Sequence, residues 1–182
     1  LLYDGVNEHG LAMAGLNFPG NAYYGPQEKD KDNITPFEFI PWILGQCETV
    51  AQARTLLERI NLVNIPFSEK LPLSPLHWMI SDRKESLVVE SMADGLHIHD
   101  NPVGVMTNNP PFEYHLFHLN NFRTLQTSTP QTDFSQSLGL KAYSNGMGAL
   151  GLPGDVISMS RFVRMGFGKE NAICDGSATQ AV

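Results

Sequence analysis

The chain has 182 residues, a net charge of −7 and a mean hydropathy of −0.17. Its 12 basic residues do not gather in one segment, which argues against a nucleic-acid partner. No apolar run approaches the roughly 20 residues of a membrane-spanning helix, and the length fits one domain with its own hydrophobic core. Two cysteines, Cys47 and Cys174, are too few for a disulfide framework. Because Cys47 stands in an apolar helical pattern, we expect it to be an inert core residue.

The first elements in chain order are two strands that form a hairpin. Residues 1–6 and 11–18 are strand-like and flank the turn sequence NEHG. A polar connection follows over residues 20–36. Residues 37–47 and 49–63 then have the apolar spacing of helices, the second with Thr49 as its N-cap.

Short strands dominate the middle of the chain, and helices its last third. The predicted strands are residues 76–82, 86–91, 95–100 and 103–107. Helices are predicted over 111–125 and 156–167, with a glycine-rich passage between them. This order predicts an α+β domain with antiparallel strands and helical layers.

Two patterns resemble cofactor or metal sites but lack the context that such sites need. GMGALG at 146–151 matches the dinucleotide fingerprint, but the Leu-Pro-Gly run after it would break the required helix. His97 with His99, and His115 with His118, have spacings that can hold a metal. No Cys, Asp or Glu accompanies them at matching spacing, so hydrogen-bonded or exposed histidines are favoured. We predict no metal and no cofactor.

Three polar residues stand beside or within apolar segments. Asn17 closes an apolar strand before Pro19, Asn108 closes the predicted strand 103–107, and Arg161 interrupts an apolar helical stretch. Strand ends and adjoining loops are where a rigid scaffold presents functional groups. In the alternative interpretation, the amides cap turns and the arginine extends to solvent along an apolar surface.

Five segments carry a resemblance to a known family. They are YDGVNEHGLAMAGLNFPG, FEFIPWILGQC, LPLSPLHWMISD, NPVGVMTNNPPFEYHLFHLNN and GMGALGLPGDVISMSRFVR. In this order they resemble the choloylglycine hydrolase family, and in particular the bacterial conjugated bile salt hydrolases. The resemblance covers nearly the whole chain and fades after Phe167.

The resemblance implies an N-terminal-nucleophile (Ntn) hydrolase with a four-layer αββα sandwich. Such enzymes cleave glycine- or taurine-conjugated bile salts to free bile acid and amino acid. A mature N-terminal cysteine attacks the carbonyl, and its own α-amine serves as the base. Leu1 corresponds to a position several dozen residues into such an enzyme. We therefore expect residues 1–182 to be a single domain that lacks the nucleophile segment and the C-terminal part.

The family motifs assign roles to the three polar residues. Asn17 matches the GLNF asparagine, whose backbone N–H helps to bind the oxyanion, and related penicillin V acylases usually carry tyrosine there. Asn108 matches the first asparagine of TNNP, whose side-chain amide is the second oxyanion donor. Arg161 matches the SRF arginine beside the nucleophile, where a fixed positive charge favours the thiolate.

The resemblance also implies where the substrate binds and how the enzyme assembles. Phe67, Leu71 and Leu73 lie in a loop similar to the one that lines the steroid side of the pocket, although ordinary loop packing also explains them. The resemblance implies conjugated bile salts as substrates and a cytoplasmic location in a bacterium. It also implies a homo-oligomer, commonly a tetramer. Two alternatives remain open: a penicillin V acylase or other N-acyl amide acylase of the same fold, and a non-catalytic bile-acid-binding fragment.

Overall fold

The computed structural model describes residues 2–173 and has a five-stranded antiparallel sheet at its centre. In spatial order its strands are β1 (Asp4–Val6), β2 (Ala12–Asn17), β5 (Leu76–Ser81), β6 (Ser86–Met92) and β7 (Gly95–Asp100). A second, two-stranded sheet pairs β3 (Asp32–Ile34) with β4 (Ile60–Leu62) in parallel.

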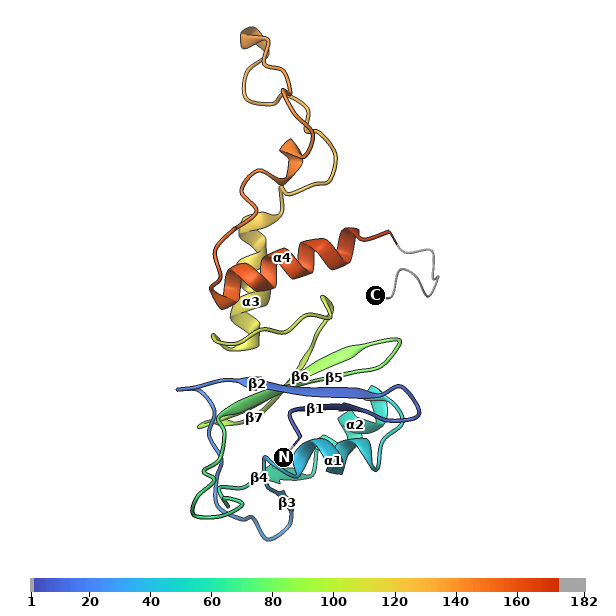
Figure 1. Ribbon diagram of the computed structural model, residues 1–182, viewed down its shortest axis with the longest axis vertical. Helices are drawn as coiled ribbons and strands as arrows, with labels where there is room; N and C mark the ends of the chain where they lie inside the picture. The colour runs from blue at the N-terminus through green and yellow to red at the C-terminus, as the bar shows by residue number, and fades with distance from the viewer. Residues whose placement is uncertain (1, 174–182) are drawn as a thin grey trace.

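Helices lie on both faces of the large sheet. One face packs against α1 (Phe39–Leu44) and α2 (Val50–Leu57), and on the other lie α3 (Phe112–His118) and α4 (Ser158–Asn171) (Figure 1). Successive strand residues point to opposite faces. Trp78 therefore packs in the core with α1 and α2, whereas Val88 packs with Phe112 and Phe162 on the opposite side.

The predicted α+β organisation with antiparallel strands and helical layers is confirmed. The opening hairpin, the three central strands and helices in all four predicted regions are present, and Thr49 caps α2 by accepting a hydrogen bond from the Gln52 N–H. Two boundaries were predicted wrongly. The helix expected over 49–63 ends at Leu57 and is followed by β4, and β3 lies inside the expected polar connection.

The strand predicted at 103–107 is absent, because Asn101 holds this segment as a turn. The Asn101 side chain accepts a hydrogen bond from the Gly104 N–H and donates one to the Val105 carbonyl. Gly104 has a positive φ of 64°, which glycine adopts without steric cost. The chain thus leaves β7 and crosses toward α3 as irregular backbone, and Asn108 lies on this crossing.

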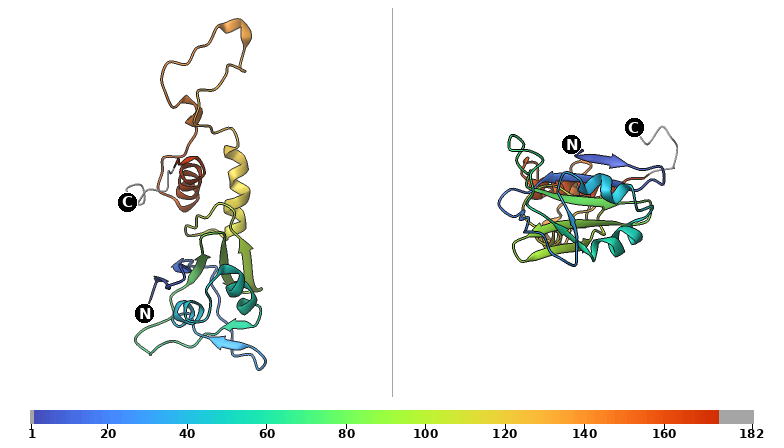
Figure 2. Two further views of the ribbon diagram at one scale, coloured as in Figure 1. Left: turned by 90° about the vertical axis from the view of Figure 1, so that its right-hand side faces the viewer. Right: turned by 90° about the horizontal axis from the view of Figure 1, so that it is seen from below.

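Residues 123–157 extend away from the layered body, as two views at right angles show (Figures 1 and 2). They contain only the short 3₁₀ turns Gln136–Leu138 and Met147–Ala149. Large apolar side chains on this arm face solvent, with Phe134 85% and Tyr143 83% exposed. We call residues 123–157 the arm.

The remaining expectations concern the cysteines and the membrane. Cys47 is buried, and burial raises the pKa of its thiol, which confirms the expected inert core position. Cys174 lies outside the described residues. Within residues 2–173, no helix combines the length and the apolar character needed to cross a membrane.

Candidate active site

The site begins at the end of β2, where Asn17 is exposed. Asn17 is paired in register with Leu76 of β5, and the next residue, Phe18, donates its N–H to the Pro75 carbonyl. Two residues earlier, Gly15 leaves room for the Trp78 ring, since a Cβ at Gly15 would lie 3.0 Å from Trp78 Nε1. The strand is therefore packed tightly against β5 up to its last residue.

Asn108 and Arg161 meet Asn17 at this strand end. Asn108 Nδ2 donates to the Asn17 carbonyl at 2.9 Å, and Arg161 Nη2 donates to Asn108 Oδ1 at 2.8 Å. Arg161 is anchored a second time, because its Nε donates to the Val156 carbonyl at 3.0 Å. The three polar residues singled out in the sequence thus form one cluster, although they come from β2, the irregular crossing and α4.

Two hydrogen-bond donors face the same edge of β2. Gly15 donates its N–H toward β1, to the Tyr3 carbonyl at 2.7 Å, and N–H groups alternate between the two edges of a strand. The Asn17 N–H and C=O therefore lie on this β1 edge, where Asn108 Nδ2 contacts the carbonyl. A primary amide carries two N–H bonds, and within residues 2–173 only one of those on Asn108 has a partner.

Two further side chains fix the backbone around Asn108. His115 is buried, and its Nε2 donates to the Asn108 carbonyl at 2.9 Å. Burial lowers the pKa of His115 despite the opposing effect of this hydrogen bond, so the ring is neutral at neutral pH. The neighbouring Asn109 donates from Nδ2 to the Pro19 carbonyl at 2.7 Å.

A buried polar network behind the cluster was not predicted from the sequence. Glu90 in β6 is fully buried and its Oε1 lies 3.0 Å from His77 Nδ1, while His77 Nε2 lies 2.8 Å from the Thr107 carbonyl. Burial by itself would raise the pKa of Glu90, but hydrogen bonds from His77 and the Phe112 N–H, together with the nearby His99 side chain, outweigh it and lower the pKa to about 2. One signal in the sequence was available, namely a charged residue inside the otherwise apolar strand LVVE.

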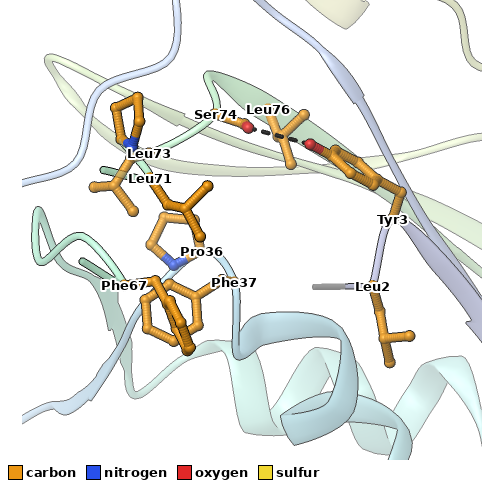
Figure 3. Close-up of a pocket in the computed structure, with 10 residues that line it drawn as sticks. Leu2, Tyr3, Pro36, Phe37, Phe67, Leu71, Leu73, Ser74 and Leu76 are labelled. Atoms are coloured by element: carbon orange, nitrogen blue, oxygen red, sulfur yellow. Dashed lines mark hydrogen bonds between the residues drawn. The ribbon is translucent and has the colours of Figure 1, made fainter. Parts of the chain in front are cut away.

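Phe67, Leu71 and Leu73 line one apolar cavity with a volume of about 30 Å³ (Figure 3). The other lining residues are Leu2, Tyr3, Pro36, Phe37, Pro72, Ser74 and Leu76. Phe37 and Phe67 meet edge to face, with ring centroids 5.3 Å apart. The sequence indicated the loop side of this cavity, whereas Leu2, Tyr3 and Phe37 come from segments that gave no such signal.

The cavity adjoins the polar cluster through Leu76. This residue lines the cavity and is also the register partner of Asn17. Polar groups on the lining are few, the Tyr3 hydroxyl lying 3.4 Å from Ser74 Oγ (Figure 3). The arrangement places an apolar surface beside donors suited to a carbonyl oxygen or an oxyanion.

The histidines with metal-like spacing have other partners. His97 Nε2 lies 2.9 Å from Asp94 Oδ1, and His115 contacts the Asn108 carbonyl. In the part of the chain that the structure describes, no three His, Cys, Asp or Glu side chains are grouped to hold a metal ion.

Comparisons with known proteins agree with this architecture. Over 173 residues, 95% of this chain, the sequence is 59% identical to the bile salt hydrolase/transferase of Lactiplantibacillus plantarum and covers 53% of that protein. A crystal structure of a variant conjugated bile acid hydrolase from Clostridium perfringens superposes with a TM-score of 0.84 at 39% identity, covering 93% of this chain and 52% of the other. Penicillin V acylase from Agrobacterium tumefaciens shares the fold, with a TM-score of 0.70 at 24% identity over 98% of this chain and 48% of the other.

The chain spans about half the length of the curated relatives it matches. The family model of linear amide C–N hydrolases, choloylglycine hydrolase family, matches residues 1–182. The Ntn hydrolase architecture of the structural neighbours agrees with this match. The chain belongs to the choloylglycine hydrolase family.

Proposed function

We propose that the intact protein hydrolyses the amide bond of glycine- or taurine-conjugated bile salts. The observation that carries this proposal is the cluster of Asn17, Asn108 and Arg161 beside an apolar cavity. The names of the two relatives, a bile salt hydrolase/transferase and a conjugated bile acid hydrolase, support the same substrate class.

In this mechanism an N-terminal cysteine, outside the residues described here, attacks the amide carbonyl. Its α-amine takes the thiol proton, and the positive charge of Arg161 favours the thiolate. The carbonyl oxygen becomes an oxyanion that accepts hydrogen bonds from the Asn17 N–H and the second N–H of Asn108. The ammonium group returns the proton to the departing amine as the C–N bond breaks. Water then hydrolyses the thioester and releases the bile acid.

The cavity supplies the affinity for the steroid in this proposal. Phe67, Leu71 and Leu73 present apolar surface that a bound steroid would cover, and each Å² removed from water contributes about 25 cal/mol. Phe67 is 63% exposed, so much of its ring is available to a ligand.

The second candidate is an acylase acting on penicillin V or another N-acyl amide. Similarity to penicillin V acylase at 24% identity shows the shared fold alone. Asn17 favours bile salts, since the resemblance places tyrosine at this position in penicillin V acylases. The third candidate is a non-catalytic bile-acid-binding protein, and activity measurements separate it from the two enzymes.

The test uses the full-length protein with glycocholate, taurocholate and penicillin V under the same conditions. We expect release of free bile acid with a higher kcat/KM than penicillin V cleavage, and loss of activity when the N-terminal cysteine is replaced by alanine. Faster cleavage of penicillin V would favour the acylase. Binding of glycocholate without turnover would show a protein that binds bile acids but does not cleave them.

We further propose that the intact protein is a bacterial protein of the cytoplasm. It would form a homo-oligomer of tetrameric size, with the arm in the contact between copies. Exposed apolar residues on a protruding segment, such as Phe134 and Tyr143, support an interface there. Within residues 2–173 Cys47 forms no disulfide, as expected in a reducing compartment. Sedimentation of the intact protein should give a tetramer, and Phe134→Ser with Tyr143→Ser a smaller species; a wild-type monomer would contradict the proposal.

A further inference from the structure

Asn108 lies on irregular backbone, so something other than a sheet must fix its position. The carbonyls of Thr107 and Asn108 each accept a hydrogen bond from a buried histidine, His77 at 2.8 Å and His115 at 2.9 Å. The Thr107 hydroxyl also donates to the Ser158 carbonyl at 3.1 Å. Side chains therefore take over the role that strand pairing would otherwise have in placing the Asn108 amide.

The two ring nitrogens of His77 have different partners. A backbone carbonyl only accepts hydrogen bonds, so Nε2 carries a proton toward Thr107. Nδ1 lies 3.0 Å from Glu90 Oε1, and the Glu90 oxygens also accept the Phe112 N–H, at 3.0 and 3.2 Å. The ring, 1% exposed, is therefore held between a fully buried carboxyl group and a backbone carbonyl.

The ring of His77 connects the two proposed oxyanion donors. One face stacks on Phe18, with ring centroids 4.3 Å apart and planes 5° apart, and Phe18 directly follows Asn17. Its Nε2 reaches Thr107, which directly precedes Asn108. A shift of this ring would move the neighbours of both donors at once.

A buried ion pair contributes little net stability compared with a well-packed apolar pair, because both charges lose their hydration. Stability alone therefore does not explain why β5 and β6 carry these two residues at facing positions. A requirement for fixed geometry beside a reaction centre explains it better, since catalysis is sensitive to displacements of about 1 Å.

We propose that Glu90 and His77 are positioning residues: the Glu90 carboxyl group fixes the His77 ring through Nδ1, and the ring holds Thr107 so that the Asn108 amide faces the substrate carbonyl. This inference rests on the proposed function, because it uses Asn108 as an oxyanion donor. Neither residue touches the substrate.

The test compares Glu90→Gln with the matched control Asp94→Asn in the intact protein. Asp94 pairs with His97 at 2.9 Å, which is the same chemistry on the exposed end of the β6–β7 hairpin. We expect Glu90→Gln to lower kcat by about 10- to 100-fold with KM nearly unchanged, because the donor is displaced but substrate contacts remain. Glu90→Asp, which retains the charge, should recover part of kcat, and Asp94→Asn should retain the wild-type value.

A spectroscopic measurement keeps this test separate from the activity itself. ¹⁵N NMR of the imidazole should show the His77 Nε2–H hydrogen-bonded to the Thr107 carbonyl in the wild type, and this hydrogen bond should be weakened or lost in Glu90→Gln. This readout does not depend on turnover, so it stands even if the intact protein fails to cleave bile salts. An unchanged His77 Nε2 resonance in Glu90→Gln, a normal kcat in folded Glu90→Gln, or an equal fall in Asp94→Asn would overturn the inference.

Discussion

At the residue scale, the two ends of the Asn108 amide have different partners. Oδ1 accepts from Arg161, which fixes the amide plane, while Nδ2 donates to the Asn17 carbonyl. Both contacts fix the amide plane and so the direction of the second N–H, which we propose as the oxyanion donor. Preorganised donors of this kind need no reorganisation when charge develops.

Arg161→Lys in the intact protein tests the role of this fixation. Arginine holds the Val156 carbonyl and Asn108 Oδ1 with two different nitrogens, and a lysine ammonium on a flexible stem cannot hold both in one plane. We expect kcat to fall about 100-fold with the fold retained. Arg164→Lys is the control, because Arg164 contacts the Pro153 and Asp155 carbonyls and not Asn108. Near-normal turnover of Arg161→Lys would mean that Arg161 is only a surface cation.

Glu90 should also give the protein a dependence on acid pH. Its pKa is lowered from 4.5 to about 2, so its contribution is complete above about pH 4.5 and is lost as the pH falls toward 2. The difference corresponds to about 3 kcal/mol of unfolding free energy. Denaturant unfolding at pH 6 and pH 3 should therefore show the wild type losing more stability than Glu90→Gln. Equal losses in the two proteins would contradict the lowered pKa.

At the element scale, the sequence predicted those elements whose patterns are local. The short apolar and β-branched runs in residues 76–91 and the helical spacing around Thr49 and Arg161 each depend on neighbouring residues. Strands β3 and β4 were missed because three residues each carry little pattern and their pairing joins distant segments. Residues 103–107 have strand-like composition, but the Asn101 side chain satisfies their backbone locally.

Phe67→Ala tests the loop that carries the cavity wall. If a steroid covers the exposed part of this ring, its loss should raise KM for glycocholate up to about tenfold, or about 1.4 kcal/mol, with kcat unchanged. Phe117→Ala provides the comparison, because Phe117 lies on α3 outside the cavity and is 76% exposed. Equal KM values for Phe67→Ala and the wild type would assign Phe67 to ordinary loop packing.

At the scale of the whole molecule, the candidate site is an outcome of tertiary structure. The sequence singled out Asn17, Asn108 and Arg161 because each is polar beside apolar residues, but their meeting depends on contacts across the sheet and α4. His77 and Glu90 were not found, since burial of a polar pair is decided by packing from both faces. The family resemblance supplied the roles that local patterns left open.

The comparison of Asn108→Ala with Asn109→Ala in the intact protein tests most directly whether Asn108 is an oxyanion donor. Both amides donate to carbonyls of the chain around the end of β2, at 2.9 and 2.7 Å, so each variant loses one such hydrogen bond, and Asn108→Ala also loses the one from Arg161. We predict that Asn108→Ala lowers kcat for glycocholate by about 10²- to 10³-fold, or roughly 2.7 to 4 kcal/mol. Asn109→Ala should instead cost about 0.5 to 1.5 kcal/mol of stability in thermal melts, with turnover retained. If Asn109→Ala were the inactive variant, or if both variants turned over normally, Asn108 would not be the oxyanion donor.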